Sequence, residues 1–499
     1  MICLENVNSL KGATLSIKLS DKVDFFKKIF KKDATFRLRE MQVNKCCNFE
    51  CAIIFFDGMV DTEKLNNGLI RPLLTNNAEN QQNDVITFLE KQILFNNELT
   101  KTNDIYSMIQ ALNLGDTVIL LDGTSEVLIA NTKGWRTRGI TEPHDEKVLQ
   151  GPREGFDEAL ILNTAMLRRK LATPDLCFER LTLGVKTQTN IFICYLDSLA
   201  DKRMLKNLKE QLNKINIDGI LDANYINELI NKNKLSLFKT VGSTERPDVV
   251  AARLLEGRIA IMVDGTPVVL TLPYLFVENF QSDDDYYLNY IYASFGRVLR
   301  YFCYQLSALL PAIYIALTNF HPNLLPADFY NSISSARSGL PFSSWSECLI
   351  LILIFEILRE TGIRMQESVG HALSIVGGLV VGQAAVEASF VSAPILIVVA
   401  FSGIAGLMVP RLKLAVITAK VILVILASLF GVFGLFIGIT LLHIHLYSID
   451  TFGVDYLYPV SRFSVSSLKD TLLRAPWWKM ITRPKIFTND VVRQRRKND

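Results

Sequence analysis

The chain has 499 residues, of which 49% are hydrophobic and 21% are charged, and its mean hydropathy is +0.24. Its 53 Lys and Arg against 50 Asp and Glu leave a net charge of +3, which excludes the strongly basic surface of a nucleic-acid-binding protein. The apolar excess lies almost entirely between Tyr301 and Leu446, and this excludes a disordered protein, a disulfide-rich secreted domain and an ordinary cytosolic enzyme.

The N-terminal part carries neither a targeting segment nor a metal motif. Its first 30 residues contain no apolar run of the kind that a signal peptide requires, so we expect this part to stay in the cytoplasm. Cys46, Cys47 and Cys51 cluster among the eight cysteines, but no His or second Cys pair lies at zinc-ligand spacing from them. We therefore expect no bound metal.

The soluble half contains an internal repeat with an offset of 140 residues. The segment 52–61 resembles the segment 192–201: each is an apolar strand, followed by an Asp and then by a second Asp where a helix starts. Amphipathic helices are predicted to follow at 62–74 and 202–215.

The second part of each repeat contains a hairpin signal. The segment 115–124 resembles 257–266 at an offset of 142, and both have an Asp-Gly pair between apolar runs. Such a pair is typical of a β-hairpin, because Gly tolerates the positive φ of a type I′ turn. The small drift in offset predicts two α/β subdomains of similar plan, at about 24–140 and 155–280, joined by a polar linker at 139–155.

The sequence contains no recognised catalytic motif: there is no P-loop, no Gly-x-Ser-x-Gly elbow and no His-Glu-x-x-His helix. The Gly-rich run 377–382 lies in an apolar stretch, where helix packing explains it better than phosphate binding. The acidic run Asp283-Asp284-Asp285 has no ligand loop around it, and we expect it to form a solvated helix start. We therefore predict a protein that is not an enzyme and has no cofactor.

The membrane half contains five apolar stretches, at 301–320, 349–358, 372–391, 395–409 and 421–442. About 20 apolar residues are needed to cross the hydrocarbon core. The second stretch is too short for this and carries Glu356, so we expect it to be re-entrant or interfacial. The other four are predicted to be spans.

Basic residues predict that both ends of the membrane half are cytoplasmic. Arg297 and Arg300 precede the first span, and residues 461–499 carry ten Lys and Arg against three Asp and Glu. Two ends on the same side require an even number of crossings, in agreement with four spans. This count places Arg411 and Lys413 on the outer side, against the charge rule.

The basic tail, residues 447–499, also carries an aromatic pair. Trp477 and Trp478 stand beside Lys479 and Arg483, a pattern typical of anchoring at an anionic lipid surface. A tail that is exposed to solvent or docked on protein fits the same residues.

Small residues recur at helical spacing in the apolar stretches. Ser374, Gly378 and Gly382 form one row, and Gly434 and Gly438 form another. Such rows let helices approach closely in lipid, so we interpret them as helix-packing positions. The general abundance of glycine in membrane helices is the alternative explanation.

Three polar residues are candidates for an ion path. Glu387 is the lone charge between 372 and 409, and it should face a bundle interior, a water path or a polar partner. Gln383 lies one helical turn earlier and could bind it through a hydrogen bond. Glu356 is a further candidate, although its spacing to Arg359 favours a helix-end ion pair. A purely structural role remains the alternative for all three.

Many motifs in one order carry a resemblance to a known family. The first are Thr244-Glu245-Arg246-Pro247-Asp248 and Asp264-Gly265-Thr266-Pro267. Later ones are Arg297-x-x-Arg300, Leu310-Pro311-Ala312, Leu358-Arg359-Glu360 and Gly382-Gln383-Ala384-Ala385-Val386. In this order they resemble the A subunit of spore germinant receptors, the GerA family of endospore-forming Firmicutes. The likeness runs from about residue 24 to the end. One departure is the absence of a Pro after Arg364.

The resemblance implies a place in a membrane complex. A-subunits of this family sit in the spore inner membrane beside a transporter-like B subunit, which recognises nutrients, and a lipoprotein C subunit. The complex senses nutrients and triggers ion release, and the A subunit is thought to form homo-oligomers. We therefore expect an oligomeric, ion-conducting subunit whose arrangement shifts when a partner binds a nutrient.

The predicted architecture is an α/β soluble N-terminal half of two similar subdomains, followed by an α-helical transmembrane bundle. The predicted parts are an extension at 1–23, subdomains at 24–140 and 155–280, a transmembrane domain at 297–446 and a cytoplasmic tail at 447–499. A secondary transporter is one alternative, but the spans are few and show no inverted repeat. A membrane-anchored signalling scaffold is another.

Overall fold

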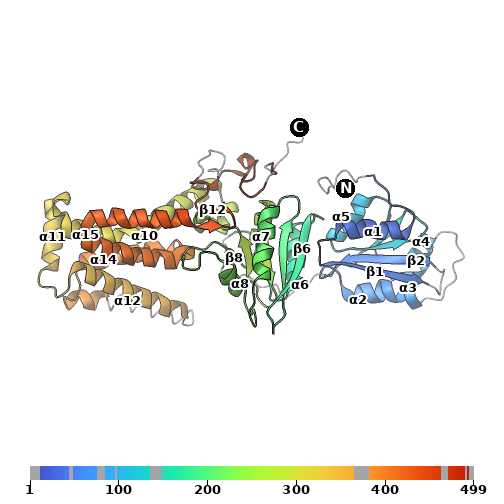
Figure 1. The fold of residues 1–499 in the computed structure, drawn as a ribbon, viewed down its shortest axis with the longest axis horizontal. Coiled ribbons are helices and arrows are strands. Elements are labelled where there is room, and N and C mark those ends of the chain that lie inside the picture. The colour runs from blue at the N-terminus through green and yellow to red at the C-terminus, as the bar shows by residue number, and fades with distance from the viewer. Residues whose placement is uncertain are drawn as a thin grey trace. The chain divides into compact units, whose positions relative to one another are not determined.

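The computed structural model describes residues 12–43, 49–75, 85–95, 98–134, 146, 148, 150–364, 380, 382–461, 470–488, 490 and 492–493. The chain divides into two compact units. The first consists of Met1–Lys234, Val241–Tyr274 and Met480–Asp499 and contains the sheets. The second consists of Leu235–Thr240 and Leu275–Lys479 and is mainly helical (Figure 1).

The first sheet is antiparallel, with the strand order β1-β2-β4-β5-β3 among the described residues. Its strands are β1 (Phe36–Val43), β2 (Phe49–Phe56), β3 (Leu99–Thr102), β4 (Thr117–Leu121) and β5 (Val127–Ala130). The helical segments with it are α1 (Leu19–Ile29), α2 (Thr62–Leu65), η2 (Asn66–Ile70), α3 (Arg71–Thr75), α4 (Val85–Phe88), η3 (Leu89–Ile93) and α5 (Ile105–Asn113).

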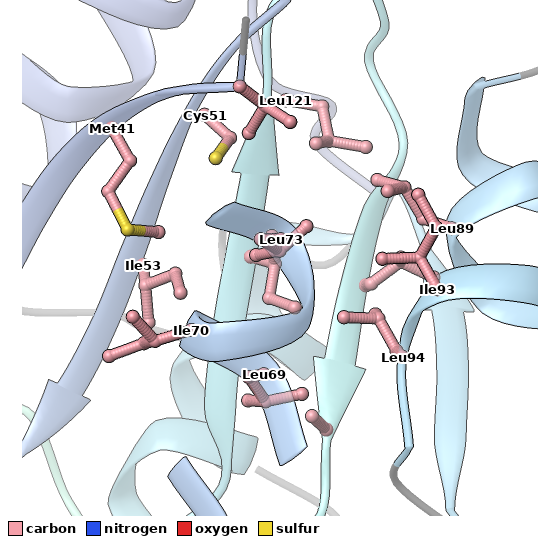
Figure 2. Packing of buried hydrophobic residues seen from close by; sticks show 14 of the residues in the cluster. Met41, Cys51, Ile53, Leu69, Ile70, Leu73, Leu89, Ile93, Leu94 and Leu121 are labelled. Atoms are coloured by element: carbon pink, nitrogen blue, oxygen red, sulfur yellow. The ribbon is translucent and has the colours of Figure 1, made fainter. Parts of the chain in front are cut away.

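Both faces of this sheet are covered, because alternate residues of a strand point to opposite sides. On one face Cys51 and Ile53 of β2 pack with Leu69 and Leu73 from the helical run 62–75 (Figure 2). On the other face the neighbouring strand residues pack against α1 and α5. The result is a three-layer α/β arrangement.

The second sheet has the same plan, with the order β6-β7-β9-β10-β8. Its strands are β6 (Leu176–Leu183), β7 (Thr189–Leu196), β8 (Gly242–Thr244), β9 (Ile259–Val263) and β10 (Val269–Leu272). Its helices are α6 (Leu160–Lys170), α7 (Lys202–Asn213), α8 (Ala223–Ile230) and α9 (Pro247–Leu255). A core between α6, α9 and the strands contains Phe178, Phe192 and Met262.

The repeated aspartates have equivalent structural roles. Asp61 caps α2 by accepting hydrogen bonds from the amides of Glu63 and Lys64, and Asp201 caps α7 through the amide of Arg203. A carboxylate at this position satisfies amides that the helix itself leaves unpaired. The repeat in the sequence therefore marks the same strand–cap–helix unit in both sheets.

The two Asp-Gly pairs lie in hairpins, but the turns differ from the predicted type. Gly123 and Gly265 have φ of 82° and 87°, whereas the preceding aspartates have negative φ, so these turns are not type I′. Each aspartate instead accepts a hydrogen bond from the first residue of a distant helix. Asp122 accepts from the amide of Leu19, at 2.8 Å, and Asp264 from that of Leu160, at 3.3 Å.

A buried ion pair joins the two halves of the first unit. Arg168 of α6 donates to the carboxylate of Asp33, and both side chains are almost fully buried. The Arg168 guanidinium also lies 3.8 Å from the ring centroid of Phe56, an arrangement that favours cation–π attraction. Breaking such a pair leaves an uncompensated buried charge.

The second unit is built from long helices. Its elements are η4 (Phe276–Phe280), η5 (Asp283–Tyr286), α10 (Tyr290–Phe320), η6 (Pro322–Leu324), α11 (Ala327–Arg337), α12 (Ser344–Arg364), α14 (Ala393–Leu407), η7 (Pro410–Leu412), α15 (Lys413–Ser448), β11 (Asp450–Thr451), β12 (Val454–Asp455) and η9 (Trp477–Lys479). By length and composition, two helices in the described chain could cross a membrane, Tyr290–Phe320 and Pro410–Ser448. The apolar helix Ala393–Leu407 is shorter.

The structure of α12 differs from the short element expected at 349–358. The helix continues on both sides of the apolar stretch and has 21 residues. The prediction from apolar residues left out the polar ends of this helix.

A turn interrupts α15 at Gly431, whose φ of 59° and ψ of −137° are not helical. A Cβ at Gly438 would come within 2.5 Å of Leu423 Cδ2, although a straight helix would separate these residues by about 22 Å. The segments 413–430 and 432–448 therefore fold back on each other. The sequence predicted an uninterrupted span at 421–442, and the structure differs because this glycine permits a reversal in its middle.

Candidate functional site

A buried ionic network surrounds the start of α10. Asp285 of η5 is 1% exposed and binds two arginines of α10. Arg297 Nε donates to Asp285 Oδ2 at 2.7 Å, and Arg300 Nη2 donates to Asp285 Oδ1 at 2.9 Å. Arg297 also donates from Nη1 to Asp470 Oδ1 at 2.6 Å. We define this set, Asp285, Arg297, Arg300 and Asp470, as the neck network.

The network shifts the ionisation of its central carboxylate. Burial alone would raise the pKa of Asp285, but hydrogen bonds from Arg300 and Arg297 and their positive charges hold this pKa below its ordinary value. The expectation of a solvated acidic helix start was therefore wrong for Asp285. Arg297 and Arg300, one turn apart on α10, were the signal in the sequence that could have identified its partners.

The C-terminal tail takes part in the neck network. Tyr286 donates from its hydroxyl to Asp470 Oδ2 at 2.6 Å, and Gln281 donates to the Asp470 carbonyl at 2.7 Å. Arg474 in turn donates to the carbonyl of Tyr286 at 3.2 Å. The residues that lead into α10 are thus fastened to the tail that follows α15.

The tail's tryptophans lie beside this network. Trp478 packs edge-on against Tyr290, with ring centroids 5.6 Å apart, and Arg474 lies over Trp477. Both indoles stay largely exposed. The structure therefore places an exposed aromatic pair at the start of α10.

Arg411 lies at the same end of the helical unit. It donates to the carbonyls of Glu278 and Gln281 at 3.3 and 3.2 Å and is 3.5 Å from the carboxylate of Asp283. The sequence-based count put Arg411 and Lys413 at the end opposite to Arg297, and this was wrong. The chain reverses within α15, at Gly431, where the count assumed one uninterrupted span.

The predicted polar pair at Gln383 and Glu387 is joined by a hydrogen bond. Gln383 Nε2 donates to Glu387 Oε1 at 2.8 Å. Both side chains are exposed in the described chain. Of the three surroundings expected for Glu387, an interior, a water path or a polar partner, the structure shows a polar partner, its neighbour one turn earlier.

Glu356 lies apart from that pair. Arg359 of the same helix donates to it, and both side chains are mostly buried. Within the described residues, no hydrogen bond or ion pair connects Glu356 to Gln383 or Glu387. The three predicted polar residues therefore form two separate groups.

The two predicted rows of small residues also lie in different surroundings. Gly434 and Gly438 face Leu426 and Leu423 of the preceding segment, so they lie where the two segments of α15 meet. A Cβ added at Gly382 would lie 3.6 Å from Leu396 Cδ2, an ordinary contact distance. Ser374 and Gly378 lie outside the described residues.

A buried carboxylate that the sequence analysis missed lies at the opposite end of the helical unit. Glu347 of α12 is fully buried and accepts hydrogen bonds at Oε2 from the amide and hydroxyl of Ser392, at 3.1 and 3.2 Å. Arg337 Nη2 lies 3.8 Å from Oε1. In the sequence Glu347 only preceded an apolar stretch, and nothing predicted its contact with Ser392, 45 residues away.

The contacts that the structure gives these groups are ion pairs and hydrogen bonds. In the part of the chain that the structure describes, no group of three or more His, Cys, Asp or Glu side chains could hold a metal ion. Arg297 and Arg300 each bind carboxylates, and Arg411 binds carbonyls and lies near a carboxylate. Such contacts suit a device that holds helices in one arrangement.

Comparisons with known proteins agree on one family. A family model described as "Bacillus/Clostridium GerA spore germination protein" matches residues 24–486. Spore germination protein KA of Bacillus subtilis is 39% identical over 461 residues, covering 92% of this chain and 84% of that protein. Spore germination protein GerLA of Bacillus cereus is 33% identical, covering 87% of this chain and 89% of that protein.

Two further similarities extend this finding. A protein of Bacillus subtilis called uncharacterized membrane protein YfkQ is 39% identical over 448 residues, covering 89% of this chain and 86% of that protein. The crystal structure of the N-terminal domain of the A subunit of the Bacillus megaterium spore germinant receptor GerK3 is 30% identical. The match covers 53% of this chain and 98% of the chain in that crystal structure, with a TM-score of 0.43.

Proposed function

Since the chain belongs to the GerA family of Bacillus and Clostridium spore germination proteins, we propose that it is the A subunit of a nutrient-germinant receptor. Family membership assigns it a role in spore germination. Its proposed task is to couple nutrient binding on a partner subunit to ion release. The partners are a transporter-like B subunit and a lipoprotein C subunit in the spore inner membrane.

Membrane insertion of the helical unit is supported by its apolar helices and by the name of one relative as a membrane protein. The end of α10 meets the start of α12, where Ser344 donates to Asn319 at 3.0 Å. The end of α12 meets the start of α15, where Lys413 pairs with Glu360 at 3.4 Å. With the reversal at Gly431, these contacts support six passes in place of four. Both ends of the unit then lie in the cytoplasm.

The observation that carries the coupling proposal is the neck network. It fastens η5, the first turns of α10 and the tail to one another through buried charges. A movement of η5 or of the tail must therefore move α10 or break these buried ion pairs, and breaking them is costly. Such an element can switch between discrete arrangements, so nutrient binding on a partner can shift their populations.

Ion conduction by a homo-oligomer is supported by the exposed pair Gln383–Glu387. An exposed carboxylate on an otherwise apolar stretch is expensive in lipid unless it faces water or protein. A neighbouring copy of the chain, or a water-filled path between copies, would supply that environment. Our proposal is that the pair lines the ion path, with Glu356 in a separate group.

Replacing Glu387 with Gln and with Leu tests this role. In spores that carry the full receptor, E387Q should slow nutrient-triggered ion release, and E387L should slow it more, because Leu also removes the polar partner of Gln383. The measurement is potassium efflux after nutrient addition, with protein level checked by immunoblot. Normal efflux in both variants would exclude Glu387 from the path.

A signalling scaffold is the second candidate, because the two covered sheets make up a large share of the chain. A scaffold would conduct no ions. Conductance of the reconstituted receptor in planar bilayers, recorded with and without nutrient, separates the two functions. A nutrient-dependent current supports the conducting subunit, and its absence in an intact, nutrient-binding receptor favours the scaffold.

A further inference from the structure

A buried charge cluster lies where α12 faces α15. Lys420 of α15 is only 3% exposed, and its charged neighbours are Glu356 and Arg359 of α12. Cys348 of α12 is also close to it. The α12 residues are spaced at whole helical turns, so they share the face that Lys420 approaches.

The cluster has more hydrogen-bond donors than acceptors. Arg359 donates to Glu356 through Nη2, but its Nε is buried and has no hydrogen-bond partner in the described part of the chain. Lys420 forms no hydrogen bond or ion pair with any residue that the structure describes. Arg359 thus leaves one buried N–H group without a partner in the described chain, near the charge of Lys420, and a buried donor without a partner is destabilising.

The cluster also has an excess positive charge. Lys420 and Arg359 contribute two positive charges, and Glu356 contributes one negative charge. Of the other carboxylates on α12, Glu360 is bound to Arg364 and Lys413, and Glu347 accepts from Ser392. Among the residues that the structure describes, one positive charge of the cluster is left without a matching carboxylate, and such a charge is costly in an apolar helical unit.

We propose that Lys420 and Arg359 bind one small monovalent anion, a halide or a short carboxylate such as formate. The anion would accept hydrogen bonds from the Lys420 ammonium and from Arg359 Nε and would cancel the remaining charge. Glu356 holds the guanidinium in place and, by its own charge, disfavours divalent anions. The proposal does not depend on ion conduction and applies equally to a scaffold.

Thermal unfolding of the purified full-length chain tests the site. The chain is kept in an uncharged detergent without phosphate groups, and chloride or formate replaces gluconate at constant ionic strength. The wild-type midpoint should rise by several degrees and saturate, because a ligand that binds the folded state stabilises it. K420M should lose this rise. K413M, which changes a more exposed lysine on the same helix, should keep it.

A variant that removes the negative charge of the cluster should bind the anion more tightly, in contrast to K420M. E356Q increases the cluster's net charge from one to two, so it should reach half-saturation at a severalfold lower anion concentration than the wild type. A substitution that only disturbed packing would weaken the response. A response in K420M equal to that of the wild type, an equal shift in all variants, or a weaker response in E356Q would each overturn the proposal.

Chloride-35 NMR provides a second test that needs no variant. Exchange of chloride with a protein site broadens its resonance, and formate should reverse this broadening by competition. Folded wild-type chain that produces no broadening at millimolar chloride would overturn the proposal even if K420M failed to fold.

Discussion

At the residue scale, Asp285 illustrates how a side chain's role depends on partners far along the chain. In the sequence it is the third of three aspartates, and such a run is usually solvated. In the structure it is buried because Arg297 and Arg300, on the following helix, both bind its carboxylate. The other two aspartates of the run do not take this position, so the acidic composition alone could not single out Asp285.

Replacing Asp285 with Asn should destabilise the full chain by about 3–5 kcal/mol at neutral pH, because Arg300 loses the carboxylate that it binds and the buried Arg297 keeps only Asp470. The folded pKa of Asp285 is lowered, so its stabilisation is present above the unfolded pKa of about 4. That stabilisation disappears as pH falls through the folded pKa. Unfolding midpoints measured between pH 3 and 7 should therefore fall less steeply with acid in D285N.

Asp283 provides the control for this prediction. It lies 3.5 Å from Arg411 and is more exposed, so D283N should change stability only slightly. Equal effects of D283N and D285N would show that the acidic run acts through its total charge and not through the neck network.

At the scale of elements, α15 shows that a hydropathy pattern does not distinguish one long helix from a helical hairpin. Residues 413–448 are apolar almost throughout, and a helix and a helical hairpin bury the same kinds of side chains. What separates the two is the backbone at Gly431, with its positive φ and its close contact with the Phe320 ring. Gly434 and Gly438 were recognised in the sequence as packing positions, but their partner helix could not be inferred.

Substituting Gly431 with Ala should lower stability by about 1–3 kcal/mol, since Ala tolerates neither this backbone conformation nor the Phe320 ring, 2.8 Å from the position of the new Cβ. Gly296, within α10, has no such conflict: its nearest neighbour would be Arg300 Nη2 at 3.5 Å. G296A should leave stability unchanged or raise it, because Ala favours a helix interior. Thermal unfolding of both variants in detergent measures the contrast, and equal losses would contradict the reversal at Gly431.

At the scale of the whole molecule, the sequence predicted the parts that depend on local pattern and missed those that depend on distant contacts. The 140-residue repeat identified the strand–Asp–helix units that occur in both sheets, because each unit is contiguous. The roles of Asp122 and Asp264 require helices about 100 residues away and left no local trace. The same holds for Glu347 with Ser392 and for Lys420 with Glu356.

The local sequence pattern and the contacts between distant residues predict different numbers of membrane passes. With four spans, Lys413 lies on the outer side of the membrane, whereas with six spans it lies in the cytoplasm with Arg411. The contact of Arg411 with the residues before α10 supports the second arrangement. A cysteine-free chain with Lys413→Cys or Ser338→Cys, expressed in intact cells and treated with a membrane-impermeant maleimide, distinguishes these models. Ser338, between α11 and α12, is exposed at the other end of the unit and lies outside in both.

We expect S338C to be labelled in intact cells and K413C to be labelled only after the membrane is opened. The reason is physical as well as topological: six passes put Arg297, Arg300, Arg411 and Lys413 on one side, in agreement with the charge rule, and leave Arg337, beside Glu347, at the outer end. Labelling of K413C in intact cells would restore the four-span arrangement. In that case the contacts between Arg411 and the residues before α10 could not exist in the membrane.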